Sequence, residues 1–154
     1  MENRRTKIKV SALENGTVID HIPAASLFQA LRILKLDNIK NPVYFGTNLK
    51  SQKYGTKGII KVQDKYFESE EFNKIALVAP TATFIEIKDY QVTSKQTVKT
   101  PEVVENYVKC FNPKCITNHQ QVPTKFKVIT DGGTIKLRCR YCEKTTTKET
   151  MEFL

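Results

Sequence analysis

The sequence predicts an α+β fold, with a ferredoxin-like βαββαβ domain followed by a small all-β domain of the zinc-ribbon or rubredoxin-like type. Strand-like and helix-like segments alternate over residues 7–92, a polar segment with Pro101 follows, and two closely spaced cysteine pairs lie in the last third of the chain. The chain has 154 residues, 40% of them hydrophobic, which is enough to form a core in each domain. We expect domains at 1–98 and 107–154, joined by a linker at 99–106.

The first strand and helix are predicted from periodicity. Lys7–Leu13 alternates polar and apolar residues, as a half-buried strand does, and Asn15-Gly16 then makes a turn into TVIDHI. A helix is expected over about 23–35, because Pro23 suits a first helical turn and leucines follow at spacings of four and three. These leucines are Leu27, Leu31 and Leu34.

The rest of the first domain completes the strand and helix order. Val43–Leu49 and Gly58–Val62 are short β-rich runs, and a second helix is expected with Ser69 as its N-cap and an end at Pro80. Thr81–Val92 supplies a last strand or a pair of strands. The order strand, helix, strand, strand, helix, strand places two helices on one face of an antiparallel sheet. The apolar stripe of the second helix is Phe72, Ile75, Ala76 and Ala79.

The C-terminal part is predicted to be a small β module. Residues 93–106 are polar and indicate either a linker or an outer strap of the second domain. A β-hairpin is expected around Asp131-Gly132-Gly133, with alternating apolar residues on both sides.

The four cysteines predict a structural zinc site. Cys110-x4-Cys115 and Cys139-x2-Cys142 each supply two thiolates, and tetrahedral zinc takes four. His119 is an alternative ligand, but four cysteines already fill such a site and leave no open position for chemistry. Disulfides fit less well, because no apolar run follows the basic residues of MENRRTKIKV as in a secretory signal, and we expect the protein to be cytoplasmic.

The charge favours an anionic partner. There are 25 Lys and Arg against 16 Asp and Glu, a formal charge of +9. A zinc ion with four thiolates carries −2, so a large positive excess remains. Nucleic acid, nucleotide phosphates and an acidic protein surface are all compatible with it.

The lysines of the first domain recur every four residues, at Lys53, Lys57, Lys61 and Lys65. Neighbouring glycines and β-branched residues argue against a helix, so Lys57 and Lys61 would share one face of a strand. Such a pair either binds a polyanion or protects a solvated strand edge.

No active site is apparent in the sequence. The adjacent Asp20 and His21 lack a credible nucleophile, because the cysteines are taken up by the metal and no serine lies in a G-x-S-x-G context. Walker and G-x-G-x-x-G loops are also absent.

Several motifs resemble those of the aspartate carbamoyltransferase regulatory chain family: NGTVIDHIPA at 15–24, GIIKV at 58–62, LVAPTAT at 77–83 and CRYCEK at 139–144. The resemblance implies a non-catalytic regulatory subunit for pyrimidine biosynthesis, with a first domain that binds ATP or CTP, UTP being a further candidate. It also implies a zinc domain that docks on the catalytic chain, in a holoenzyme of two catalytic trimers and three regulatory dimers. Neither nucleic acid nor a membrane is then expected as a partner.

The resemblance also assigns site residues. It implies base contacts from the first strand, ribose and phosphate contacts from the GTVIDHIP motif, two pocket lysines and a closing strand with Lys95 at the phosphates. The nucleotide residues are Val10, Ala12, Leu13, Val18, Asp20, His21, Lys57, Lys61, Ile87, Tyr90, Val92 and Lys95; the catalytic-chain contacts are Asn112, Lys114, Arg140, Tyr141 and Glu143.

Three positions depart from the family pattern. Ser11 and Glu14 stand where glutamate and lysine flank the base strand, and Ile85 replaces a pocket asparagine. These changes bear on how ATP and CTP are distinguished. Two other classes remain as alternatives: a nucleic-acid-binding zinc ribbon, whose affinity would fall steeply with salt, and an independent enzyme, which would turn over substrate by itself.

Overall fold

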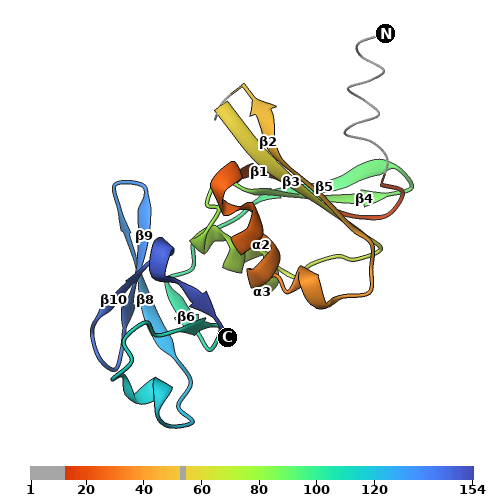
Figure 1. The fold of residues 1–154 in the computed structure, drawn as a ribbon. Helices are drawn as coiled ribbons and strands as arrows, with labels where there is room; N and C mark the ends of the chain where they lie inside the picture. Colours follow the sequence, from red (N-terminus) through yellow and green to blue (C-terminus); the bar gives the residue numbers. More distant parts are fainter. Residues whose placement is uncertain (1–12, 53–54) are drawn as a thin grey trace.

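The computed structural model describes residues 13–52 and 55–154 (Figure 1). The predicted strand over Lys7–Leu13 lies outside the described residues except for Leu13, as do Lys53 and the candidate positions Val10, Ser11 and Ala12.

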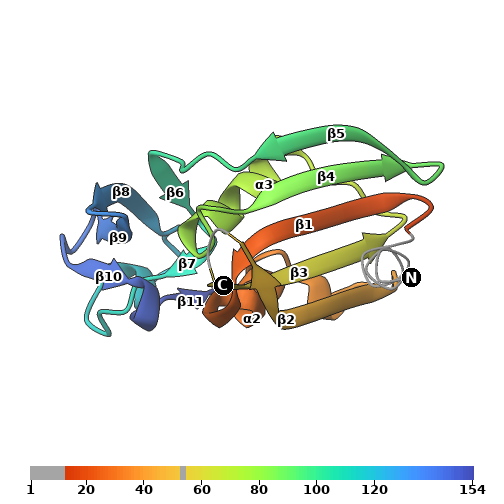
Figure 2. The same cartoon turned by 90° about the horizontal axis from the view of Figure 1, so that it is seen from above.

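The first lobe is a five-stranded antiparallel sheet with helices on one face (Figures 1 and 2). The strand order is β2-β3-β1-β4-β5, which confirms the predicted βαββαβ arrangement and adds β5 at one edge. In chain order the elements are β1 (Gly16–Pro23), the 3₁₀ turn η1 (Ala24–Ser26), α2 (Leu27–Ile33), η2 (Leu36–Asn38), β2 (Val43–Ser51), β3 (Gly55–Gln63), α3 (Ser69–Lys74), η3 (Ile75–Leu77), β4 (Thr83–Lys88) and β5 (Gln91–Thr97).

Strand β1 was not predicted as a strand. For these residues the sequence predicted only a turn at Asn15-Gly16 that leads into TVIDHI. Strand β1 is the middle strand of the sheet, and four consecutive residues from Gly16 onward are buried, so the alternation that marks a half-buried strand is missing. Gly16 is required there, because its φ is +144° and a Cβ would lie 2.1 Å from the carbonyl oxygen of Val62.

The core lies between this sheet and the helices. Ile19 of β1 pairs with Ile60 of β3 and Phe84 of β4, and all three are buried on the helix-covered face. The predicted stripe of the second helix is buried at every position, whereas the N-cap is Glu68 rather than Ser69. The side chain of Glu71 accepts a hydrogen bond from the backbone N–H of Glu68 at 3.5 Å, which fixes the start of the helix one residue earlier.

The second lobe is all β. Its four-stranded sheet has the order β10-β9-β8-β6, and β7 pairs with β11 beside it. Of the segment 93–106, expected to be a linker or an outer strap, residues 93–97 instead belong to β5 of the first sheet, whereas β6 pairs with β8 as an outer strand of the second. The elements are β6 (Val103–Glu105), β7 (Val108–Lys109), η4 (Ile116–Asn118), β8 (Lys125–Asp131), β9 (Thr134–Cys139), β10 (Thr145–Thr147), η5 (Lys148–Thr150) and β11 (Glu152–Phe153).

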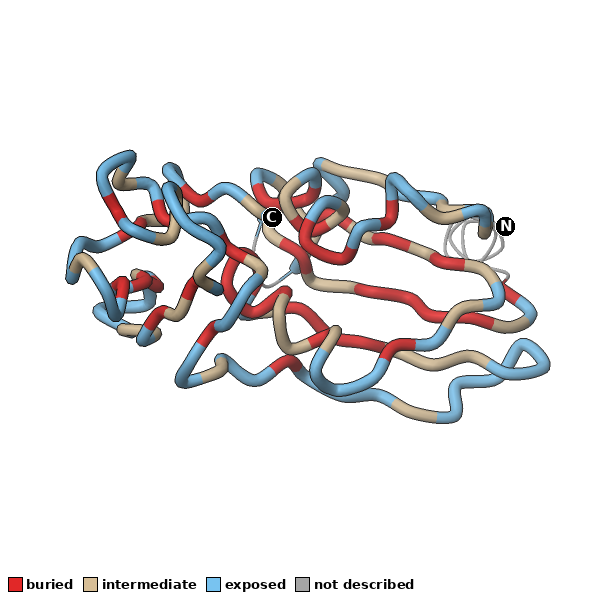
Figure 3. The backbone as a smooth tube through the Cα atoms, turned by 90° about the horizontal axis from the view of Figure 1, so that it is seen from below, coloured by how far each residue is buried: buried red, intermediate tan, exposed pale blue. Residues whose placement is uncertain are grey.

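The two lobes touch each other through polar and aromatic contacts. The Gln29 side chain donates to the carbonyl of Lys148 at 3.2 Å, and Lys148 also donates to the buried Ser26 hydroxyl. Lys74 lies over the ring of Tyr107, 4.7 Å from its centroid. Figure 3 shows buried residues in both lobes and at the region where they meet. Within the described part of the chain, no helix is long and apolar enough to span a membrane.

Candidate metal centre and effector face

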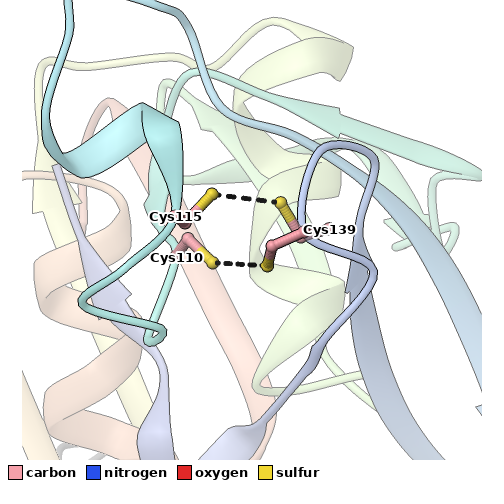
Figure 4. A group of neighbouring side chains, drawn as sticks. Cys110, Cys115 and Cys139 are labelled. Carbon is pink, nitrogen blue, oxygen red and sulfur yellow. Dashed lines mark hydrogen bonds between the residues drawn. The ribbon is translucent and has the colours of Figure 1, made fainter.

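Four cysteine sulfurs converge in the second lobe. Cys110 follows β7, Cys115 precedes η4, Cys139 ends β9 and Cys142 lies in the next turn. Their Sγ atoms all lie within 4.8 Å of one another, and all four thiols are free of disulfides. Figure 4 shows Cys110, Cys115 and Cys139 pointing toward one another from two separate loops.

The spacing of these sulfurs fits a tetrahedral metal ion. Cys110 Sγ lies 3.7 Å from Cys142 Sγ, and Cys115 Sγ lies 3.7 Å from Cys139 Sγ. A zinc–sulfur bond of roughly 2.3 Å gives a tetrahedron with edges of about 3.8 Å. The donor set and its dimensions therefore support a structural metal ion.

Neighbouring groups stabilise thiolates at this centre. The Thr117 hydroxyl donates to Cys115 Sγ at 3.2 Å, and the Tyr141 N–H donates to Cys139 Sγ at 3.4 Å. Burial raises the pKa of the Cys110 and Cys139 thiols. Burial also opposes ionisation of Cys142, but hydrogen bonds from the Asn112 side chain and the Lys144 backbone lower its pKa to about 7. Because burial disfavours four neighbouring thiolates, a divalent cation is the natural counter-charge.

The predicted catalytic-chain contacts surround this centre on the two cysteine loops. Tyr141 is 48% exposed. Two apolar neighbours that the sequence did not predict as part of this surface, Phe111 and Ile116, are 46% and 43% exposed. Asn112 has a bracing role as well, since its side chain accepts from the Lys114 N–H at 3.1 Å. Together these loops present an exposed surface of mixed apolar and charged character.

Two residues brace the first cysteine loop, and the sequence predicted this role for neither of them. Asn118 donates to the carbonyls of Cys110 at 3.0 Å and Asn112 at 2.8 Å. His119 is exposed, and its Nε2 lies 2.6 Å from the carbonyl oxygen of Pro113. Both hold the first cysteine loop in shape without being ligands.

In the first lobe, a row of candidate residues crosses the sheet on the face opposite the core. Lys61 of β3 pairs with Val18 of β1, Val18 pairs with Ile85 of β4, and Ile85 pairs with Lys95 of β5. Directly paired residues point to the same side of a sheet, so both lysines project from the face that carries no helix. Burial lowers the pKa of the Lys61 ammonium group.

One end of this face carries charge and a strained backbone. Lys57 Nζ lies 2.9 Å from Asp20 Oδ1, and His21 has a left-handed φ of 59°. Burial raises the pKa of the Asp20 carboxyl, but hydrogen bonds from the Lys57 side chain and the His21 backbone N–H, together with the nearby positive charge, outweigh it and the net pKa is lowered. His21 Nδ1 lies 3.2 Å from the Thr83 hydroxyl, and the Thr81 hydroxyl donates to the His21 carbonyl at 2.8 Å. An open groove of about 760 Å³ begins at His21 and Lys57.

The opposite end is apolar and aromatic. Ile87 pairs with Gly16 and with Val92, and Val92 and Tyr90 are 62% and 65% exposed. The Tyr90 N–H donates to the carbonyl of Glu14 at 2.9 Å, next to the buried Leu13. The apolar end, at the pair of Gly16 with Ile87, and the charged end, at Asp20, are four residues apart along β1, which is a distance of about 13 Å.

The structure thus brings the described nucleotide candidates onto one face, with apolar groups at one end and cations at the other. Lys57 and Lys61 lie on β3, which is flanked by β2 and β1, so they do not protect a strand edge. Tyr66, whose hydroxyl donates to the Ile87 carbonyl at 2.9 Å, and Thr83 were not predicted. Their partners are distant in sequence, and no local pattern indicates them.

Comparisons with known proteins agree with this organisation. The family model described as "Aspartate carbamoyltransferase regulatory chain, allosteric domain" matches residues 8–99, and the "metal binding domain" model of the same chain matches residues 102–152. The chain is 44% identical over 154 residues to an aspartate carbamoyltransferase regulatory chain of Bacteroides thetaiotaomicron, covering 100% of both. It is 43% identical over 151 residues to that of Porphyromonas gingivalis, with 98% and 99% covered, and 49% identical over 145 residues to that of Pyrococcus horikoshii, with 93% and 95% covered.

Proposed function

The chain belongs to the family of aspartate carbamoyltransferase regulatory chains, and from this premise we propose that it binds ATP and CTP in its first lobe and a zinc ion in its second. It is a regulatory subunit and not an enzyme. The observation that carries the proposal is the match to such regulatory chains over the whole length of the sequence.

The effector site that we propose is the helix-free face of the first sheet. A nucleoside triphosphate has an aromatic base at one end and several negative charges at the other. The face has the same polarity, with Tyr90 and Val92 at one end and Lys57, Lys61 and Lys95 toward the other. Phosphates would compete with Asp20 for Lys57, because that lysine is already paired at 2.9 Å.

The metal site that we propose holds zinc through Cys110, Cys115, Cys139 and Cys142. Four thiolates at tetrahedral spacing suit zinc and leave no position for a substrate, so the ion would have a structural role. It would fix the two loops that carry Asn112, Lys114, Arg140, Tyr141 and Glu143, which we propose as contacts with the catalytic chain.

We further propose that two regulatory chains pair through β2. This strand is an edge of the sheet, and three apolar side chains near it are strongly exposed: Phe28 (62%), Tyr44 (57%) and Phe45 (51%). Phe28 and Phe45 pack edge to face with ring centroids 5.9 Å apart, which makes a compact apolar patch. Three such dimers would bridge two catalytic trimers in the cytoplasm, where the complex acts in pyrimidine biosynthesis.

Regulation would arise from a difference in contacts between quaternary states. A nucleotide bound to the first lobe favours one state, and the docked second lobe passes this bias to the catalytic chains. Couplings of about 1–3 kcal/mol are typical, which corresponds to several-fold to hundredfold changes in affinity.

The test is co-expression of this chain with its catalytic chain, followed by aspartate saturation curves with and without ATP, CTP or UTP. We expect a zinc-dependent complex whose curves shift with at least one nucleotide. A catalytic trimer that purifies alone, or curves that no nucleotide moves, would refute the proposed function.

A further inference from the structure

The outer face of the second sheet carries an unusual row of like charges. Lys127 of β8 and Arg138 of β9 are direct cross-strand partners, and both are exposed. Lys136 lies two residues from Arg138 on β9 and points to the same side. Like charges directly opposite one another destabilise a sheet, so this arrangement is unfavourable in the isolated chain.

Few ion pairs compensate for this row. Arg138 has one carboxylate neighbour, Glu143, at 4.0 Å, which is the limit for an ion pair. Among the residues that the structure describes, neither Lys127 nor Lys136 forms an ion pair, whereas Lys125 in the next row pairs with Glu105 at 3.3 Å. The unfavourable charge is therefore concentrated in Lys127, Lys136 and Arg138, which we call the basic row.

The surroundings of the basic row suit contact with a protein. The other side of the sheet packs into the lobe, with Phe126 and Leu137 buried, so the outer side is the one that faces a partner. Lys127 and Arg138 also have partners on the two outer strands. Lys127 pairs with Val103 of β6, which is 42% exposed, and Arg138 pairs with Thr145 of β10. An apolar residue, a threonine and two cations across four strands form a flat mixed surface, as at protein interfaces.

This face is continuous with the loops proposed to dock on the catalytic chain. Arg138 is two residues from Arg140 and contacts Glu143, and both of these belong to that proposed surface. The outer face of this sheet, taken as four strands wide and three outward-facing residues long, measures roughly 14 Å by 14 Å, or about 200 Å². A stable interface needs about 800 Å² on each partner, so the basic row is too small to bind alone and extends the loop surface instead.

We propose that the basic row is a second part of the docking surface and binds a cluster of carboxylates on the catalytic chain. The proposal rests on the proposed function, since it presumes that the second lobe docks there. An acidic protein surface is favoured over nucleic acid because Glu105, Asp131 and Glu143 flank the row on the same side and would repel a continuous polyanion. Binding of discrete carboxylates would relieve the repulsion between Lys127 and Arg138.

The experiment compares the full-length chain with the double variant Lys127→Glu/Arg138→Glu in binding to the purified catalytic trimer at low and high salt. We expect the variant to bind about tenfold or more weakly at low salt, because it reverses two interface charges, with a smaller difference at high salt. The control Lys35→Glu/Lys40→Glu makes the same charge change on exposed loops of the first lobe and should bind like the unmodified chain.

Folding is checked with the single variant Lys127→Glu, which places opposite charges across from each other at Arg138. Its thermal midpoint in the isolated chain should be unchanged or higher, while its binding to the trimer is weakened. A midpoint that falls well below that of the unmodified chain would contradict the assignment of this pair.

The outcomes separate the two proposals. If the unmodified chain binds the trimer and the double variant binds equally well at every salt concentration, the basic row has no docking role and the inference is wrong. Binding of single-stranded or duplex DNA or RNA that the double variant abolishes, without any change in trimer binding, would overturn it as well. If the unmodified chain does not bind the trimer, the proposed function fails and the inference fails with it.

Discussion

Replacing Lys61 with methionine should weaken nucleotide binding strongly while leaving the fold intact. The side chain projects from the helix-free face of β3, in the row that crosses to Lys95 on β5. Partial burial lowers its pKa, so part of the desolvation of the ammonium group has already taken place in the folded chain. A hydrogen bond to a charged phosphate is then worth about 1.5–3 kcal/mol. Its loss corresponds to roughly 10- to 150-fold weaker binding.

Equilibrium dialysis with labelled CTP and ATP would measure the effect on the purified chain, and calorimetric unfolding would confirm the fold. Lys65→Met is the matched control, because Lys65 has the same spacing along the chain but lies past the end of β3 with its Nζ 5.2 Å from the centre of the Phe67 ring. We expect the control to keep the affinity of the unmodified chain. Equal affinities for the Lys61 variant and the control would refute the assignment of this face as the effector site.

Three further predictions concern stability. Asp20→Asn should destabilise the chain at neutral pH by about 1–3 kcal/mol through loss of the pair with Lys57. Since the pKa of Asp20 is lowered in the fold, the difference in urea titrations should begin to shrink as the pH falls below the ordinary aspartate value of about 3.9, and it should vanish only below the lowered pKa of the folded state. Removing the bound metal with a chelator or a mercurial should unfold residues 105–154, where metal binding contributes on the order of 10 kcal/mol, and unchanged circular dichroism and proteolysis would exclude a structural metal. Gly16→Ala should cost several kcal/mol, because the new Cβ would lie 2.1 Å from the Val62 carbonyl oxygen and φ is +144°; a thermal midpoint within a degree of the parent would contradict the strained geometry.

Local patterns in the sequence predicted the fold well where one side of an element is buried. The helix stripe at Phe72 and Ile75 and the hairpin at Gly132-Gly133 follow from periodicity and turn chemistry, and both are present. Strand β1 was missed because a central strand buried on both sides has no alternation. The metal centre was predictable for a similar reason, since the short spacing within each cysteine pair already determines that both sulfurs can reach one ion.

The roles of the lysines could not be decided in the same way. Whether Lys57 and Lys61 lie at a strand edge or over a binding face depends on the strand order, and the pairing of β3 with both β1 and β2 is set by tertiary packing. Contacts such as Thr83 with His21 and Asn118 with the first cysteine loop also join residues that no short pattern connects. Sequence therefore indicates which residue types carry the chemistry, and the sheet order determines which of them act together.

The position of the lobe contact bears on how the two sites could be coupled. Ser26, which accepts a hydrogen bond from Lys148, is only five residues from His21 at the charged end of the effector face. On the other side, Lys148 follows β10, whose Thr147 pairs with Lys136 of the basic row. Any rotation of one lobe against the other must break or rebuild the contacts of Lys148 with Ser26 and Gln29. A ligand that shifts the His21 segment would therefore act next to the contacts that orient the two lobes, and a coupling between the two proposed sites would require that these contacts have two alternative arrangements.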